Sequence, residues 1–159
     1  MPIRPIAASP FPVTYAAFGY LRDEADRLLL VANRYESLGV LWGVPGGAME
    51  PGETAEACVA REFEEEVGLR VRVRRDCGVI ERVKPEWKIH LCARFFVVEA
   101  LSGALQVHPD EEHVFDFRFL APEEIRNWPE PVLGRGRILE FLREPHAQPR
   151  HVLMAPGEE

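Results

Sequence analysis

Three glutamates, Glu62, Glu65 and Glu66, lie close together in the most acidic stretch of the chain, GGAMEPGETAEACVAREFEEEVGL at 46–69. On a helix, their spacing places all three carboxylates on one face. Like charges so placed cost about a few tenths of a kcal/mol per pair, and glutamates near a helix C-terminus also oppose its dipole. Stability alone therefore does not select this cluster. Bound Mg²⁺ or Mn²⁺ would turn the repulsion between these carboxylates into a favourable interaction, because both ions bind carboxylate oxygens. Both ions also keep coordination positions for water and phosphates.

The element that must carry these carboxylates is predicted to be a helix over 55–67. Thr54 can cap its N-terminus, and Gly68 can take the left-handed conformation that ends a helix. The interval between them contains no glycine or proline. Phe63 and Val67 belong to an apolar stripe on a different side of this helix. The sequence thus predicts a helix packed on a core, with the carboxylates facing outward.

The residues around the glutamates have a spacing that resembles the Nudix box, the loop–helix–loop signature of the Nudix hydrolases. By average residue composition, such a match arises by chance about once in a billion positions. One position departs from the usual pattern, because Phe63 stands where the family commonly has an aliphatic residue. The positions that match are Gly47, Glu53, Arg61, Glu62, Phe63, Glu65, Glu66, Gly68 and Leu69.

This resemblance implies a pyrophosphohydrolase that depends on Mg²⁺ or Mn²⁺ and cleaves a nucleoside diphosphate linked to another moiety. It implies that Glu53 supports the metal network and that Arg61 organises the site. The guanidinium of Arg61 can pair with Glu53 or Glu65 and hold the carboxylates apart. The catalytic residues implied are Glu53, Arg61, Glu62, Glu65 and Glu66. The metal ligands implied are Gly47, through its carbonyl oxygen, with Glu62, Glu65 and Glu66.

Two residues outside the box are predicted to contact substrate. Arg34 ends the second predicted strand, at a position where related enzymes often place a phosphate-binding base; a plain surface arginine is an equal alternative. Glu112 lies in the loop before the HVFDF segment, where some relatives carry a general base. A glutamate of the helix can serve as the base instead.

The rest of the chain is expected to form an α+β domain, with strands before and after the acidic helix. The first two strands are separated by the polar turn RDEAD and are expected to form a hairpin. The later strands alternate apolar and polar residues, as expected of a sheet with one face on a core. Strands are predicted at 13–21, 27–35, 71–84, 88–99 and 113–120, and further helices at 122–125 and 134–144.

A single domain is predicted over 1–144, and the family resemblance implies an α/β/α sandwich with a mixed sheet and a loop–helix–loop motif. In 88–99, the alternation places Ile89 on the core face and His90 and Cys92 on the other face. The segment 145–159 is proline-rich and aperiodic. It is expected to be a flexible, loosely packed tail, or to serve a contact that the sequence does not identify.

The composition of the chain limits the classes of molecule that it is expected to bind and the cellular compartment in which it is expected to work. The chain has 159 residues, 47% of them apolar, and a net charge of −7 without a block of basic residues, so no nucleic-acid polymer is expected as a partner. There is neither a long apolar run nor a signal-like start, so no membrane association is expected. The three cysteines are widely spaced and match no disulfide or metal framework. A cytoplasmic location is therefore expected.

The substrate is less constrained than the chemistry. Compact size favours a MutT-like enzyme acting on a (deoxy)nucleoside triphosphate or a related nucleotide. Pro85 has a spacing from the box that is associated with ADP-ribose pyrophosphatases, which leaves an ADP-ribose or nucleotide-sugar pyrophosphatase as an alternative. Two further hypotheses are a catalytically silent nucleotide sensor and a structural domain with an acidic helix face. A catalytically silent member would typically lack one of the carboxylates of the box, and none of them is missing here. Many relatives dimerise, so a homodimer stays open.

Overall fold

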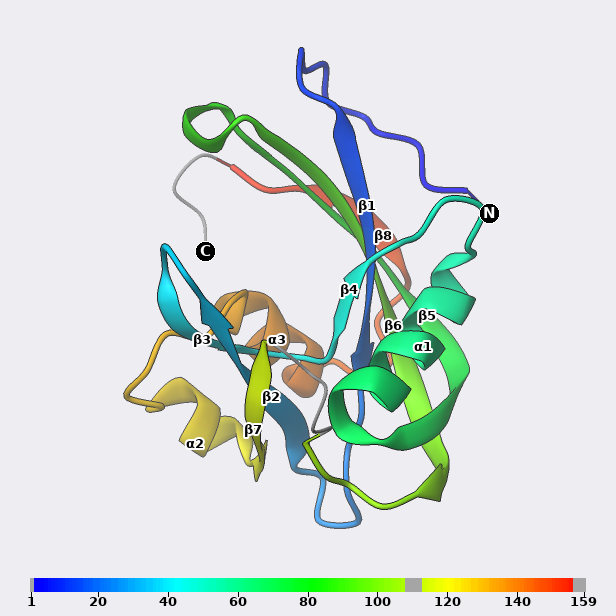
Figure 1. The fold of residues 1–159 in the computed structure, drawn as a ribbon, viewed down its shortest axis with the longest axis vertical. Helices are drawn as coiled ribbons and strands as arrows, with labels where there is room; N and C mark the ends of the chain where they lie inside the picture. Colours follow the sequence, from blue (N-terminus) through cyan, green and yellow to red (C-terminus); the bar gives the residue numbers. More distant parts are fainter. Residues whose placement is uncertain (1, 108–112, 156–159) are drawn as a thin grey trace.

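The computed structural model describes residues 2–107 and 113–155, which form two sheets and three α-helices (Figure 1). The larger sheet is mixed, and its strand order is β4-β1-β6-β5-β8. Its strands are β1 (Val13–Tyr20), β4 (Gly46–Ala48), β5 (Leu69–Lys84), β6 (Ile89–Gly103) and β8 (Arg150–Leu153). The smaller sheet is antiparallel, with β3 (Gly39–Gly43), β2 (Leu28–Tyr35) and β7 (Val114–Leu120) in that order.

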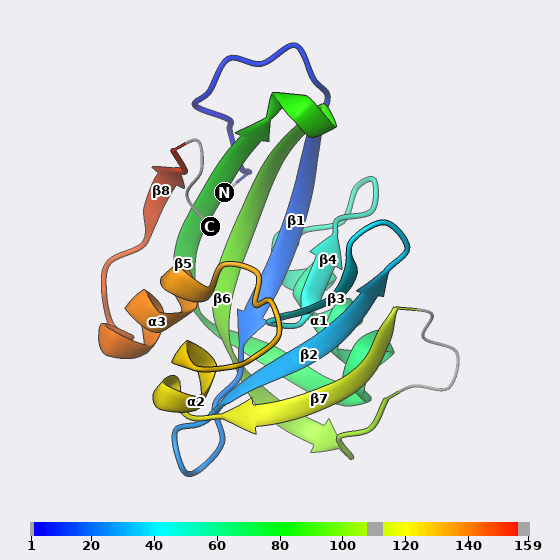
Figure 2. The ribbon, with the colours of Figure 1, turned by 90° about the vertical axis from the view of Figure 1, so that its left-hand side faces the viewer.

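Helices cover the sheets on two sides. The helix α1 (Ala55–Val67) lies on one side, and α2 (Pro122–Arg126) and α3 (Arg135–Arg143) lie on the other (Figure 2). A short 3₁₀ helix, Pro85–Trp87, joins β5 to β6. The central strand β2 is buried over residues 28–32, and the side chains there alternate between a core cluster around α1 and a second cluster that includes residues of α2 and α3. The predicted α+β class and layered sandwich are confirmed.

The predicted hairpin between the first two strands is wrong. The two strands meet only next to their turn, where Arg22 bridges Leu28 and the Leu29 amide donates to the Leu21 carbonyl over 2.9 Å. Beyond that point β1 pairs with β4 and β6, and β2 pairs with β3 and β7. Both strands are interior to their own sheets, so each needs partners on both edges, and these partners are distant in sequence.

The strand β6 shows a second departure from the expected pattern. His90 and Cys92, which alternation placed away from the core, are buried, and Ile89 is exposed. The reason is that β6 is central in its sheet and is covered on both faces for part of its length, so alternation alone does not define one buried face. His90 is accommodated because its ring nitrogen reaches the carboxylate of Glu81, at 2.7 Å.

Part of the C-terminal segment belongs to the larger sheet. Arg150–Leu153 forms β8, which pairs in parallel with β5 at the edge of the larger sheet. Gly78 permits this approach, because a Cβ there would lie 2.1 Å from the Arg150 carbonyl oxygen. The sequence of this segment has no periodicity that predicts a strand, because a strand of four residues is too short to show a clear alternation.

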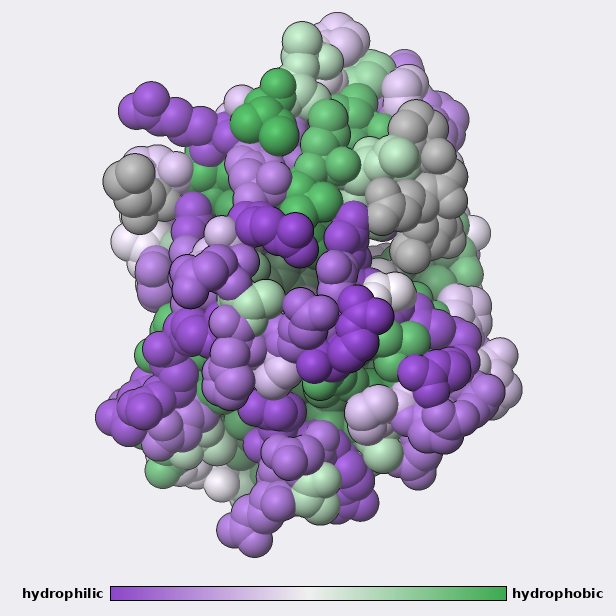
Figure 3. Space-filling view, turned by 180° about the vertical axis from the view of Figure 1, so that it is seen from behind, coloured by the Kyte–Doolittle hydropathy of each residue, from purple (hydrophilic) through white to green (hydrophobic). Residues whose placement is uncertain are grey.

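The face on the far side of Figure 1 is mostly hydrophilic, with a strip of apolar side chains among the polar ones (Figure 3). Within the described residues, no helix is long and apolar enough to cross a membrane.

Candidate active site

The helix α1 begins and ends where the sequence predicts. The Thr54 hydroxyl accepts a hydrogen bond from the Ala57 amide over 3.1 Å, and Gly68 has φ 72°, the left-handed conformation at the helix end. Phe63 and Val67 are fully buried in the core beneath the helix. This anchoring fixes the rotation of α1. It leaves Glu65 half-exposed and Glu62 partly exposed, whereas Glu66, which was expected to face outward, is buried beside Val67.

Arg61 is the organising centre of the acidic cluster. Its Nε and Nη2 bind the two oxygens of Glu53 at 2.8 and 3.0 Å, a bidentate pairing. Its Nη1 donates to Glu62 and to Glu65, both over 3.1 Å, and Nη2 also reaches the Ala48 carbonyl over 3.1 Å. One guanidinium therefore sets the positions of three carboxylates and of the loop that precedes the helix.

The charges in this cluster are unequally balanced. The side-chain hydrogen bond from Arg61 lowers the pKa of the Glu53 carboxyl to about 2. The same pairing raises the pKa of Arg61 above its ordinary value. Among the described residues, Arg61 pairs with Glu53, Glu62 and Glu65, and Glu66 is nearly buried close by. A cluster of carboxylates of this kind is suited to a hard divalent cation.

The strand β4 brings backbone groups against these glutamates. The Gly46 amide donates to Glu66 over 3.3 Å. Gly47 lies so close to Glu62 that a Cβ at this position would be 2.5 Å from a carboxylate oxygen. The carbonyl oxygen of Gly47 accepts from the thiol of Cys58 at 3.4 Å, and burial raises the pKa of that thiol to about 12. The predicted metal-ligand residues are therefore neighbours across β4 and α1.

Gly47→Ala tests this close approach. The backbone of Gly47 is not in the left-handed region. The atoms nearest to the added methyl group are those of the Glu62 carboxylate, which must move. We expect kcat to fall at least about tenfold, because a misplaced catalytic group costs that much or more, with the melting temperature nearly unchanged. The measurement is steady-state kinetics with thermal unfolding. Ala48→Gly, a change at the next residue that adds no atoms, is the control, and wild-type kcat in Gly47→Ala would contradict the assignment.

A mainly apolar pocket of about 180 Å³ adjoins the cluster, because Gly46 belongs to its lining. The side chains of Phe18 and Phe95 stack in this lining, with ring centroids 5.3 Å apart. Asn33 adds a polar amide and Arg137 a cation. The sequence offered little signal for this pocket, since aromatic residues in apolar strands are commonly core residues and its lining comes from elements far apart in the chain.

Tyr35 connects the pocket to the cluster. It lines the pocket, and its hydroxyl is close enough to Glu66 for the two to interact electrostatically. Burial raises the pKa of Tyr35 above its ordinary value, and the Glu66 carboxylate adds to the rise. The hydroxyl therefore stays neutral at physiological pH and can donate a hydrogen bond. Sequence reasoning did not identify this residue.

The two substrate-contact predictions outside the box have different outcomes. The guanidinium of Arg34 lies over the ring of Phe115, 4.5 Å from its centroid, and Arg34 is absent from the lining of the pocket beside Gly46. The alternation along β2 explains this, because Asn33 and Tyr35 line the pocket and Arg34 lies between them. Glu112 lies outside the described residues, so its role as a base stays a prediction.

The donor set fits a hard divalent cation better than a soft one. Three carboxylates and one carbonyl provide only oxygen, and the tight fit of Glu62 on Gly47 leaves no room there for another side chain. Among the described residues, the group whose metal-ligating atoms all lie within 4.8 Å of one another is Glu81, His90 and Cys92, and the carboxylates of α1 do not come that close together in this structure. That group lies in a different part of the fold, between β5 and β6, and combines one carboxylate with a nitrogen and a sulfur donor.

The chain is similar to curated proteins and to solved structures. The chain is 29% identical over 122 residues to an ADP-ribose pyrophosphatase of Methanocaldococcus jannaschii, a match that covers 76% of this chain and 69% of that protein. It is 28% identical over 149 residues to an 8-oxo-dGDP phosphatase of Homo sapiens, covering 92% of this chain but only 44% of that protein. A crystal structure of a MutT protein from Methanosarcina mazei superposes with a TM-score of 0.73 at 17% identity, covering 89% of this chain and all of that one, which shows the shared fold.

The family itself is settled by a broader match. The profile of the NUDIX domain matches residues 12–141, a span that contains the acidic cluster, its helix and most of the two sheets. The chain therefore belongs to the Nudix hydrolase family.

Proposed function

We propose that the protein is a divalent-cation-dependent pyrophosphohydrolase of a nucleoside diphosphate derivative, with Mg²⁺ or Mn²⁺ held by Glu62, Glu65, Glu66 and the Gly47 carbonyl. The observation that carries the proposal is the juxtaposition at Gly46: a cluster of carboxylates that Arg61 helps to order lies on one side, and an aromatic pocket lies on the other. A linked nucleotide has the matching parts, a charged diphosphate and a flat apolar base.

The chain's own groups have distinct roles in this reaction. A bound divalent cation would neutralise phosphate charge and acidify the attacking water. Arg61 keeps the carboxylates apart and correctly turned, and its bond to Glu53 secures the loop before α1. The neutral hydroxyl of Tyr35 can donate to a phosphate oxygen between cluster and pocket. The proposed base is Glu112 or a glutamate of α1.

The pocket supports binding of the base rather than of a sugar alone. Stacking of a nucleobase on an aromatic side chain contributes about 1–3 kcal/mol. Phe18, Phe95 and Tyr35 all line the pocket, and Asn33 can distinguish bases through its amide. We propose a (deoxy)nucleoside triphosphate or a related nucleotide as the substrate. Because one relative is named as an ADP-ribose pyrophosphatase, ADP-ribose or a nucleotide sugar is the second candidate.

The experiment is a hydrolysis panel read by mass spectrometry. dGTP, 8-oxo-dGTP, ATP, UDP-glucose, ADP-ribose, diadenosine tetraphosphate and coenzyme A are each incubated with and without Mg²⁺. Magnesium-dependent cleavage of one class supports the proposal, and the product masses identify the phosphorus that is attacked. No cleavage of any compound, with nucleotide binding intact, would contradict it in favour of a catalytically silent sensor.

Location and assembly are proposed as well. The three cysteines are free, which is compatible with a reducing compartment, and we propose the cytoplasm. A small-molecule substrate is the proposed partner, and a homodimer is to be tested by light scattering.

A further inference from the structure

The carboxylate of Glu81, in β5, is completely buried, and a set of N–H groups surrounds it. Burial alone would raise the pKa of Glu81, but the backbone amides and imidazoles that donate to it hold the pKa at about 2. Its Oε1 accepts from the Ala7 amide at 2.9 Å and His90 Nε2 at 2.7 Å, and its Oε2 accepts from the Ile6 amide at 2.9 Å and His151 Nε2 at 2.6 Å.

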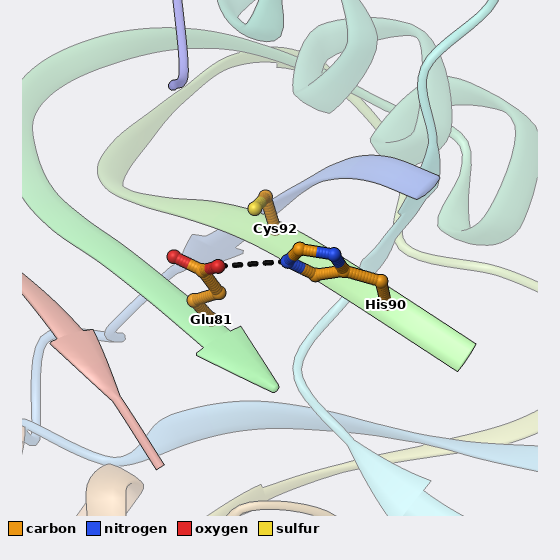
Figure 4. Close-up of side chains that lie close together, drawn as sticks. All are labelled: Glu81, His90 and Cys92. Carbon is orange, nitrogen blue, oxygen red and sulfur yellow. Dashed lines mark hydrogen bonds and ion pairs between the residues drawn. The ribbon is translucent and has the colours of Figure 1, made fainter. Parts of the chain in front are cut away.

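The group formed by Glu81, His90 and Cys92 has ligand atoms within 4.8 Å of one another, close enough for a metal ion. Figure 4 shows the Glu81 carboxylate directed at the His90 ring, with the Cys92 sulfur beside them. Because an ionised carboxylate only accepts hydrogen bonds, the His90 nitrogen that faces it carries the proton and cannot bind metal there. Burial also raises the pKa of Cys92 to about 11, so its thiol is protonated. The hydrogen bonds therefore make this group a structural hub.

The hub connects segments that are far apart in the sequence. Ile6 and Ala7 belong to the segment before β1, His90 to β6 and His151 to β8. The strand β8 is the weakest of these, because it lies at the sheet edge and pairs with β5 through only four residue pairs, in parallel. A hydrogen bond from His151 to a buried charge therefore adds to the few contacts that hold β8.

Met154, the residue after β8, lines the pocket proposed to bind the substrate. Met154 is nearly buried, and its amide donates to the Glu81 carbonyl over 2.9 Å. Its sulfur accepts from Arg82 Nη2 at 3.1 Å. Met154, Arg82 and Leu91 all belong to the lining of the pocket that also contains Phe18 and Gly46. The C-terminal segment thus supplies a wall of the pocket beside the acidic cluster.

We propose that Met154 is a specificity-determining residue that contacts the nucleobase, and that Glu81 and His151 are positioning residues that hold it there through β8. The inference rests on the proposed function. A thioether is polarisable and packs well on the face or edge of an aromatic ring, so Met154 is suited to a flat base in this aromatic pocket. Glu81 and His151 lie behind the wall and act on the substrate only through Met154.

The test compares His151→Ala and Met154→Ala with matched controls. We expect each variant to raise KM for the preferred nucleotide about tenfold, equivalent to one good contact, with kcat within about twofold. His151→Gln should restore part of the loss, because its amide can donate to Glu81. Met154→Leu, which keeps the volume, should lie near wild type. The controls are His146→Ala, an exposed histidine in the loop before β8, and Leu153→Ala, an exposed side chain on β8 itself.

Hydrogen exchange is a second measurement, and it shows whether His151 holds residues 151–154 in place. Hydrogen exchange of the amides at 151–154 should accelerate in His151→Ala and stay unchanged in His146→Ala. An unchanged KM in Met154→Ala, or a His151→Ala variant that lowers kcat and leaves KM alone, would overturn the inference. If wild type cleaves no nucleotide, the proposed function fails instead. Calorimetric affinity for α,β-methylene-ATP then replaces KM in the same comparison, and equal affinities of wild type and Met154→Ala would overturn the inference.

Discussion

Replacing Glu65 with glutamine is expected to lower kcat at least about a hundredfold while the chain stays folded. The substitution removes one negative charge from the cluster and keeps the side-chain shape. The side chain of Glu65 is 52% exposed, and its bond to Arg61 is an exposed i,i+4 pair, so its loss costs about 0.2–1 kcal/mol. Relief of repulsion from Glu62 offsets part of that cost, at about a few tenths of a kcal/mol. Stability should therefore change little.

The matched control for this variant is Glu64→Gln. Glu64 is the preceding residue of the same helix, is exposed, and occupies an undefined position of the box. It removes the same charge from the same helix, so any general electrostatic effect appears in both variants. Equal kcat values for Glu65→Gln and wild type would remove Glu65 from the mechanism.

Arg61→Lys is expected to be the second most damaging change, despite keeping the charge. A lysine ammonium cannot reproduce the bidentate pairing with Glu53 while also reaching Glu62 and Glu65. We expect kcat to fall about a hundredfold and the free energy of unfolding to fall by about 1–3 kcal/mol, since partly buried carboxylates lose their partner. Arg70→Lys, at an exposed arginine just beyond α1, is the control.

The pH dependence of stability gives this variant an independent test. In wild type the pKa of Glu53 is lowered from 4.5 to about 2, so its contribution to stability is complete above pH 4.5 and is lost as the pH falls toward 2. In Arg61→Lys the folded pKa returns toward 4.5, so this contribution is small throughout. Urea unfolding at several pH values should therefore show a steeper acid loss in wild type than in the variant. Identical slopes would mean that Arg61 does not stabilise the Glu53 carboxylate.

The parts of the site that could be predicted from the sequence are local. The limits of α1 depend on Thr54 and Gly68, which act within one turn of the helix, and the pairing of Arg61 with Glu53 joins residues of one short segment. Local spacing determines both, so the pattern of residue types was sufficient. The α+β class followed similarly from periodicities inside individual segments.

The parts that could not be predicted depend on contacts between distant segments. The hairpin of the first two strands was wrong because turn chemistry does not reveal that each strand belongs to a different sheet. His90 was expected on an exposed face, but its burial depends on Glu81, on another strand, and on the ends of the chain. The pocket also depends on distant segments, since Tyr35 and Met154 both line it and are far apart in the sequence.

The central claim is that the carboxylates of α1 bind the metal ion. The most direct test measures Mn²⁺ binding by electron paramagnetic resonance, with α,β-methylene-ATP and α,β-methylene-ADP-ribose present in separate titrations. It compares wild type, Glu64→Gln, and the combined variant Glu62→Gln, Glu65→Gln, Glu66→Gln. We predict saturable protein-dependent binding in wild type and Glu64→Gln that is absent from the combined variant while it remains folded. Equal Mn²⁺ binding by all three proteins would contradict the assignment of these carboxylates as the metal site.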